Sequence, residues 1–241
     1  MSEPSSAAPL RRTRRSVWEQ VILFLLAAAA AISVFITVGI VATLFGEGSS
    51  FFKEVSIPDF LFGTEWRPRD GEWGVLPLLF GSLKVAFFAG LVAVPLGVGA
   101  AIYLSEYAPE RVRRIIKPIL EMLAGLPTIV LGFFAIEALT PALQNIGAVP
   151  SGQTFSGLSA GIVVGLLILP LISSLSEEAI RAVPRSMREG AYGLGATKPT
   201  VCMRIIVPAA LSGIVASCVL GLSRAVGETM AVTLAAGLVP S

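Results

Sequence analysis

The stretch VILFLLAAAAAISVFITVGIVATLF, residues 21–45, decides the class of fold, because it holds no charged side chain over a length that can cross a bilayer. A crossing needs about 20 mainly apolar residues, each rising about 1.5 Å. A basic cluster precedes this stretch, as it would precede a signal peptide; it consists of Arg11, Arg12, Arg14 and Arg15. The apolar run is too long for the core of a signal peptide, so we expect an uncleaved first transmembrane helix.

The composition of the whole chain agrees with a membrane protein. Of its 241 residues, 54% are apolar and 14% are charged, whereas soluble domains carry about 25% charged residues. Disorder is excluded, because it requires low hydrophobicity and high net charge, and the net charge here is +2. The chain has no histidine and only two cysteines, Cys202 and Cys218. This composition excludes zinc fingers, histidine-based triads and a disulfide framework.

Four more apolar segments can span a membrane, at residues 76–104, 115–139, 158–175 and 205–222. Their glycines and prolines would break soluble helices but are tolerated in a membrane bundle. An apolar stub at 229–239 is about half a span long, so it can be the start of an absent sixth helix or a re-entrant segment. The sequence therefore predicts an all-α, polytopic transmembrane helical bundle of five spans plus a C-terminal apolar stub.

The basic residues predict the orientation. Most of the 18 lysines and arginines lie before the first span, in the second-to-third loop and in the fourth-to-fifth loop. Lys and Arg accumulate in short cytoplasmic loops, so the N-terminus is expected in the cytoplasm. The expected divisions are a cytoplasmic basic tail at 1–20, the first transmembrane helix at 21–45, an extracytoplasmic loop at 46–74, and a core at 75–241 that includes an inner loop at 176–204.

The inner loop, SEEAIRAVPRSMREGAYGLGATKPTVCMR, is too polar to span a membrane but carries a helical apolar stripe. The stripe recurs at i, i+4 and i+7 and consists of Met187, Ala191 and Leu194. Gly193 and Gly195 can end one short helix, and Thr197 with Pro199 can start another. We expect two short helices parallel to the membrane. Such a helix can lie in the membrane interface or bind a groove in a partner protein.

The same loop resembles the EAA signature of ABC importer permeases, EAA-x3-G-x9-I-x-L-P. Gly190 replaces the first alanine of that signature and Val207 replaces its leucine. The resemblance implies a MetI-like type I ABC importer permease, in which this loop is the coupling helix that docks in a groove of a cytoplasmic ATPase. The coupling residues that it implies are Glu189, Gly190, Ala191, Gly195, Ala196, Ile205 and Pro208.

The resemblance extends to phosphate-uptake permeases of the PstC type. It is carried by FLFGTEWRP (60–68), WGVLPLLFGSLKVAFFAGLVAVPLGVGAAIYLSEYAPERVRR (73–114), LEMLAGLPTIVLGFFA (120–135) and GLSRAVGETMAV (221–232). It implies a subunit of an ATP-driven phosphate importer in the inner or plasma membrane of a prokaryote. The implied partners are a second homologous permease in a heterodimer, two ATPase subunits, an extracytoplasmic phosphate-binding protein and membrane lipid. Permeases of this family usually have six spans, and five are expected here, so by this resemblance we expect the sequence to be about one helix short.

Several classes of function are not expected. The chain has no G-x-x-x-x-G-K-[ST] motif, so ATP hydrolysis is expected in a separate subunit and the chain is not expected to be an enzyme. No cofactor or metal is expected. The basic residues are confined to the membrane flanks and give no nucleic-acid footprint. Three alternatives stay open: a permease for another oxyanion such as molybdate or sulfate, a secondary transporter, and a non-transporting membrane scaffold.

Two charged residues are candidates for the substrate pathway. Arg224 and Glu228 are four residues apart and can pair on one helical face when the route is empty. The guanidinium fork suits a tetrahedral oxyanion. The resemblance places both at positions implicated in phosphate passage. The alternative is an ion pair near the outer interface that only fixes helix register.

Three further ionisable residues lie inside the expected spans, where they are functional candidates by default. Lys84 and Glu137 lie on the same side of the bilayer by position along their spans, so we expect that they can form an intramembrane ion pair. Glu121 is nearer the inner surface, close to basic residues. Pairing and snorkelling to the interface are the favoured interpretation for all three.

Overall fold

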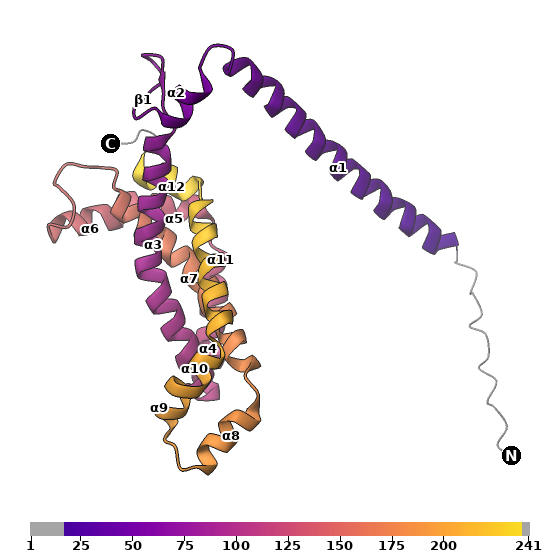
Figure 1. Ribbon diagram of the computed structural model, residues 1–241, viewed down its shortest axis with the longest axis vertical. Coiled ribbons are helices and arrows are strands. Elements are labelled where there is room, and N and C mark those ends of the chain that lie inside the picture. The colour runs from indigo at the N-terminus through magenta and orange to yellow at the C-terminus, as the bar shows by residue number, and fades with distance from the viewer. Residues whose placement is uncertain (1–16, 238–241) are drawn as a thin grey trace. The chain divides into compact units, whose positions relative to one another are not determined.

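A computed structural model describes residues 17–237 (Figure 1). In chain order they form α1 (Val17–Phe51), α2 (Ile57–Phe62), β1 (Trp66–Arg67), β2 (Glu72–Trp73), α3 (Leu76–Ile102), the π-helical segment η1 (Tyr103–Tyr107), α4 (Glu110–Ala124), α5 (Thr128–Phe134), η2 (Ala135–Leu139), α6 (Thr140–Asn145), α7 (Gly157–Ala182), α8 (Arg185–Gly193), α9 (Lys198–Val201), η3 (Cys202–Ile206), α10 (Val207–Ala209), α11 (Leu211–Val226) and α12 (Met230–Ala236). An N-terminal unit ends at Phe60, and a larger unit begins at Leu61. Of the expected cytoplasmic tail, 1–20, residues 1–16 lie outside the described part of the chain.

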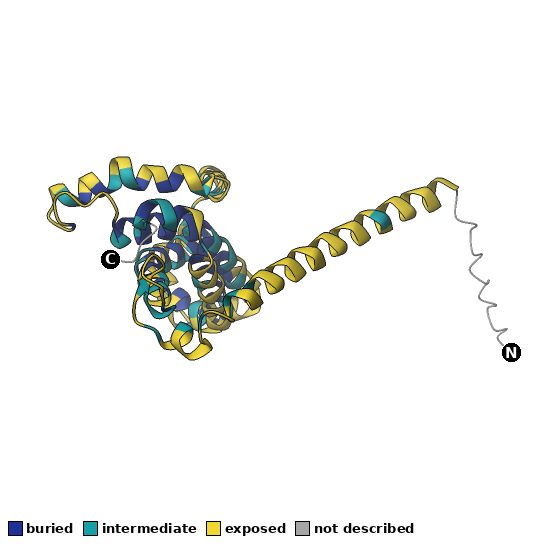
Figure 2. Ribbon diagram, turned by 90° about the horizontal axis from the view of Figure 1, so that it is seen from above, coloured by how far each residue is buried: buried dark blue, intermediate teal, exposed yellow. Residues whose placement is uncertain are grey.

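The N-terminal unit consists mainly of α1, which confirms the first expected span. This helix has 35 residues, so it extends past both ends of the apolar stretch 21–45. None of its residues is buried, and Figure 2 shows it exposed along nearly all its length. Side chains that are apolar on every face of a helix suit lipid rather than water. Within residues 17–237, four helices are long and apolar enough to cross a membrane, or five if one bent pair counts as a span.

The core of the larger unit is built around α7, the most deeply buried helix. Its residues pack against α3 in one cluster and against α8, α9 and η3 in another. Two glycines let the backbones of α3 and α7 approach closely. A Cβ atom on Gly165 would lie 3.0 Å from the carbonyl oxygen of Ala89, and one on Gly97 would lie 3.0 Å from the side chain of Ile172. Small residues at helix contacts are how membrane helices associate, because apolar burial gives them little drive in lipid.

The third expected span, 115–139, is wrong as a single helix. The chain forms α4, breaks at Gly125, and starts α5 after Pro127, whose ψ of 129° is extended. Proline lacks the backbone N–H that a helix interior needs and keeps the preceding residue out of the helical region. The spanning helix is instead the continuous run of α5, η2 and α6, Thr128–Asn145.

The fifth expected span, 205–222, is also divided. The segment Lys198–Ala209 meets α11 at an angle of 67°. The bend follows Pro208, which cannot donate a backbone hydrogen bond to the turn before it. The described part of the apolar stub forms α12, with Ala231 and Ala235 fully buried. Its last described turn is tied to the start of α7, because Ser156 N donates to the carbonyl oxygen of Ala235 over 2.9 Å.

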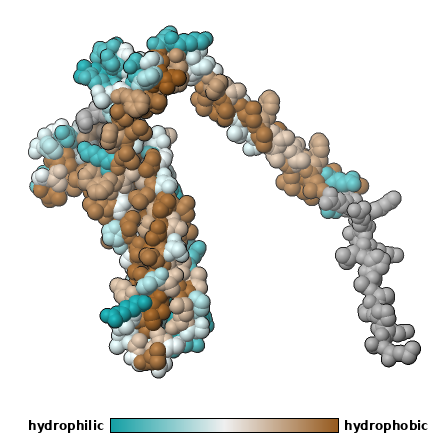
Figure 3. Space-filling model, viewed as in Figure 1, coloured by the Kyte–Doolittle hydropathy of each residue, from teal (hydrophilic) through white to brown (hydrophobic). Residues whose placement is uncertain are grey.

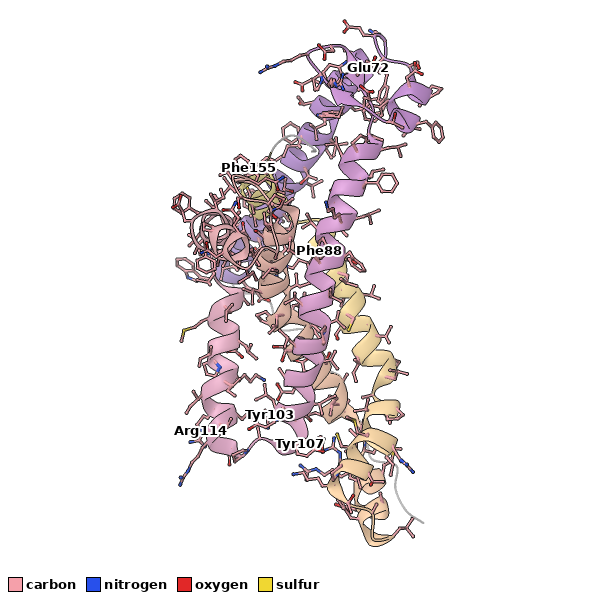
Figure 4. The ribbon with its side chains drawn as sticks, turned by 90° about the vertical axis from the view of Figure 1, so that its left-hand side faces the viewer. Glu72, Phe88, Tyr103, Tyr107, Arg114 and Phe155 are labelled. Carbon is pink, nitrogen blue, oxygen red and sulfur yellow. The ribbon has the colours of Figure 1, made fainter. Side chains whose placement is uncertain are left out.

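The larger unit has two ends of different character. We call the end that carries η1, α8 and α9 the loop end, and the end that carries β1 and β2 the hairpin end (Figures 1 and 4). The hairpin pairs Trp66 with Trp73, whose rings pack edge to face at 5.8 Å. Between the ends, exposed apolar side chains such as Leu83, Phe87 and Leu91 line α3. Figure 3 shows hydrophobic surface along the bundle and hydrophilic surface over the hairpin.

Candidate functional site

The inner loop folds as two short helices, which confirms that prediction, although it starts later than expected. The segment from residue 176 to Ala182 belongs to α7, and the loop proper begins at Val183. α8 ends at Gly193, and α9 begins after Thr197 with a proline in its first turn. The N-cap Thr197 has an extended ψ of 156°, as an N-cap requires.

Gly195 is the residue that separates the two helices. Its φ is +80°, a left-handed conformation that glycine adopts without steric cost. Its N–H donates to the carbonyl of Tyr192 over 2.9 Å, and the N–H of Ala196 donates to the carbonyl of Ala191 over 3.1 Å. These two bonds form a Schellman cap. In this motif the C-cap is Leu194, the glycine that follows it is Gly195, and the residue three positions before the C-cap is Ala191. The A-x3-G spacing of the signature is therefore the geometry of a helix end.

The signature residues lie on different faces of the loop. Ala191 is buried, whereas Glu189 and Gly190 are exposed. Leu194 is 91% exposed, the largest exposed fraction among the large apolar side chains of the described chain. Downstream, Ala196 and Ile205 are half-buried against the same cluster as Ala191, and Pro208 is exposed. The loop thus has a buried side that packs on the bundle and a free side that includes Leu194.

An ion pair that the sequence did not indicate holds the buried side. Nη1 of Arg188 lies 3.0 Å from Oε1 of Glu106 in η1, and its Nη2 donates to the carbonyl of Ile180 in α7 over 2.8 Å. The exposed fractions of the two side chains are 23% for Arg188 and 7% for Glu106. A second contact ties α9 to η1, because Nζ of Lys198 lies 5.2 Å from the ring centroid of Tyr107. Figure 4 shows Tyr107 at the loop end.

A second charged cluster, centred on Glu177, lies near the end of α7. This carboxylate is 3% exposed. It pairs with Arg113 of α4, lies 3.2 Å from Nε of Arg181, and lies 3.9 Å from Nζ of Lys117. The only local signal for this cluster is the i, i+4 spacing of Glu177 and Arg181, since both α4 residues are distant in sequence. The cluster fixes α4 to α7 where the two helices meet.

Arg224 and Glu228 do not share a helix, so their expected pairing on one helical face is wrong. α11 ends at Val226, and Gly227 follows as its C-cap. Within residues 17–237 no ion pair joins the two side chains. Oε1 of Glu228 instead accepts from the N–H of Ala231 over 3.4 Å, at the start of α12. Arg224 is exposed on the last turn of α11.

Lys84 and Glu137 are not brought together either. Both are exposed, and no ion pair joins them in the described part of the chain. Lys84 faces a cleft of about 610 Å³ at the hairpin end, which Arg67 and Gly157 also line. Glu121 is exposed on α4 and lines a groove of about 460 Å³ beside Arg113, near the basic residues expected for it. Among residues 17–237, no group of three or more His, Cys, Asp or Glu side chains is placed to hold a metal ion.

Comparisons with known proteins agree with this architecture. Residues 93–239 match the family described as binding-protein-dependent transport system inner membrane component. Among solved structures, a chain of the MetNI methionine ABC transporter has a TM-score of 0.53 at 24% identity, covering 68% of this chain and 74% of that chain. At this identity the likeness concerns the fold alone, and it supports the expected MetI-like bundle.

Curated relatives extend the similarity beyond the matched domain. A probable ABC transporter permease protein, YqgH, of Bacillus subtilis is 37% identical over 89% of this chain and 68% of that protein. The phosphate transport system permease protein PstC of Xylella fastidiosa (strain 9a5c) is 37% identical over 74% of this chain and 60% of that protein. PstC of Pasteurella multocida is 35% identical over 86% of this chain and 70% of that protein. The chain therefore spans between 60% and 70% of the length of these relatives.

Proposed function

The chain belongs to the family of binding-protein-dependent transport system inner membrane components, and we propose on this basis that it is a permease subunit of an ATP-driven phosphate importer. The observation that carries the proposal is the family match over residues 93–239, which includes α7 and the whole α8–α9 loop. Phosphate is the proposed substrate because several relatives at 34% identity or more are named as phosphate transport permeases.

The α8–α9 loop is proposed to dock on a cytoplasmic ATPase. Its exposed apolar side chains, Leu194 and Met187, lie in a polar segment at one end of the bundle. An amphipathic helix of this kind fits a hydrophobic groove in a partner protein. The positive-inside distribution supports a cytoplasmic loop end, a cytoplasmic N-terminus and a hairpin end that faces the extracytoplasmic binding protein.

The proposed complex contains a second, homologous permease subunit and two ATPase subunits. Nucleotide-driven closure of the ATPases moves the docked loops, and the helices attached to them then open the route toward the binding protein. A loop of this kind shifts the equilibrium only if it contacts the two states of its partner differently. Glu189 and Leu194 lie on the exposed side of the loop and are the residues proposed to meet the ATPase.

Arg224 is proposed to meet the oxyanion in the route. Its guanidinium lies on the last turn of α11 and has no ion-pair partner among the described residues, so it is available to an anion. Phosphate moving through a low-dielectric region needs counter-charge, because desolvating an unpaired ion costs several kcal/mol. Glu228 lies half-buried two residues past the helix end.

Co-purification followed by a functional assay tests the proposal. The chain is purified with its neighbouring subunits, reconstituted in liposomes, and supplied with a phosphate-loaded binding protein, and ATP hydrolysis is measured. Stimulation by phosphate-loaded but not by sulfate- or molybdate-loaded binding protein is expected. Purification of the chain without any bound ATPase subunit would contradict the proposal. Transport that survives deletion of residues 190–198 would indicate a secondary transporter instead.

A further inference from the structure

The α8–α9 loop is joined through the backbone to only some of the helices that it must move. Its first end continues from α7, and its second end continues through η3 and α10 into α11. α3 is separated from the loop by more than 70 residues of sequence, yet it packs along the length of α7 and contributes buried residues to both core clusters. Any movement of the loop therefore reaches the loop end of α3 only through side-chain contacts.

Those contacts converge on η1, the π-helical turn that ends α3. From α8, Arg188 reaches Glu106 at 3.0 Å, and from α9, Lys198 lies over the ring of Tyr107 at 5.2 Å. Glu106 and Tyr107 are consecutive in η1. Arg188 and Lys198 lie on opposite sides of the break at Gly195. Each short helix is thus held to the same turn by its own contact.

The ion pair is the stronger of the two contacts. Glu106 is 7% exposed, so water screens it little and the attraction to Arg188 is stronger than at a free surface. Arg188 also donates to the carbonyl of Ile180 at the end of α7. A single guanidinium therefore joins α8, η1 and α7. The planar fork of arginine suits such a three-way contact, which a lysine ammonium would not hold in the same geometry.

Beneath these contacts lies a buried cluster of apolar side chains. Ala101 of α3 and Ala191 of α8 are in one buried cluster with Val201 of α9 and Ile206 of η3. Apolar contacts of this kind hold the helices together without fixing a direction, because the hydrophobic effect is not directional. The directional restraint between the loop and α3 comes from the two charged contacts above them.

We propose that η1 is the receiver of the coupling loop, with Glu106 and Arg188 as positioning residues that transmit the movement of α8 to α3. The inference rests on the proposed function, since it specifies how a docked loop acts on the bundle. Lys198 and Tyr107 provide a weaker second restraint on α9. A loop held at both helices moves η1 as a body, whereas a loop held only by its backbone ends can pivot without moving α3.

The test compares single neutralisations and a charge swap in the assembled complex. Glu106→Gln and Arg188→Gln are each purified with the ATPase, and the double variant Glu106→Arg/Arg188→Glu is made beside them. For each, the amount of bound ATPase and the ratio of ATP hydrolysis with and without phosphate-loaded binding protein are measured. We expect ATPase to be retained, because the docking side of the loop is untouched, and the stimulation ratio to fall by a factor of about 5 or more. The swap restores part of that ratio.

The matched control is the Glu110–Arg114 pair of α4, which lies at the same end of the bundle with both side chains about 80% exposed. Glu110→Gln should leave the stimulation ratio unchanged. The inference is overturned if Glu106→Gln keeps the stimulation ratio of the wild type, or if the charge swap restores none of the lost ratio. In either case, stimulation of the wild-type complex leaves the proposed function intact. A wild-type complex without ATPase overturns both.

Discussion

Two nearly buried carboxylates at the loop end pair with arginines of other helices, whereas three charged side chains toward the hairpin end have no ion-pair partner among the described residues. Glu177 and Glu106 are nearly buried at the loop end, and each meets an arginine from another element. Toward the other end, Lys84, Glu137 and Arg224 are exposed and form no ion pair with described residues. An unpaired charge within a membrane span is costly. The difference therefore separates charges that hold the fold from charges available to a substrate, a lipid headgroup or a partner subunit.

The loop-end charges should dominate stability. Replacing Glu177 by alanine leaves Arg113, Lys117 and Arg181 facing one another without their shared carboxylate. Removing one partner of a buried ion pair costs about 3–5 kcal/mol, and we expect the lower end because the three cations are partly exposed and can turn toward water. The midpoint of thermal unfolding of the purified chain in detergent measures the loss.

The matched control for that variant is Glu178→Ala, because Glu178 is the exposed neighbour on the same helix. Its unfolding midpoint should match that of the wild type within the effect of an ordinary surface change, about 0.5 kcal/mol. Equal midpoints for the two variants would remove the basis for treating the loop end as the charge-stabilised end.

Replacing Arg224 should differ from replacing Glu177. We expect a large effect on transport and little effect on assembly. Arg224→Gln removes a charge that has no ion-pair partner in the described chain, so the complex should form normally. A hydrogen bond to a charged group contributes about 1.5–3 kcal/mol, which corresponds to roughly a 10-fold to 100-fold loss of phosphate uptake. Uptake into liposomes per assembled complex is the measurement. Unchanged uptake would show that Arg224 does not meet the anion.

The comparison also shows which features a single sequence can predict. The spans at α1, α3 and α7 follow from long apolar runs, and the break between α8 and α9 follows from Gly195 and Thr197. These are local signals. The breaks in the third and fifth expected spans do not follow from the sequence, because apolar composition continues across Pro127 and Pro208 and a membrane bundle tolerates proline within a helix.

The ion pairs were not predictable for a different reason. Glu177 and Arg113 are 64 positions apart, and their contact depends on how α4 lies against α7. Arg224 and Glu228 show the converse error, because their spacing of four predicts a helical pair only if the helix continues through Gly227, and it does not. Short-range spacing indicates contacts only inside an element whose end is known.

Gly195 offers a test of moderate size at the loop end. Its φ of +80° is accessible to other residues only at a cost of about 1–2 kcal/mol, so Gly195→Ala should loosen the Schellman cap and lower the unfolding midpoint. Gly190→Ala is the control, because Gly190 lies inside α8 and a Cβ atom there would meet nothing within 4 Å. That substitution should stabilise the helix by up to about 1 kcal/mol. If both substitutions shifted the unfolding midpoint in the same direction, the left-handed conformation of Gly195 would not be what determines the stability of this helix end.

The smallest effect is expected for Lys84 and Glu137, and it tests the unpaired end directly. Lys84→Gln and Glu137→Gln should each change the free energy of unfolding by no more than about 0.5 kcal/mol, because neither removes an ion pair among residues 17–237. The two changes should also add in the double variant, since residues without a shared contact do not couple. Unfolding midpoints of the four chains form a double-mutant cycle. A coupling energy above about 0.5 kcal/mol would show that the two side chains meet, and the hairpin end would then be held by charge in the same way as the loop end.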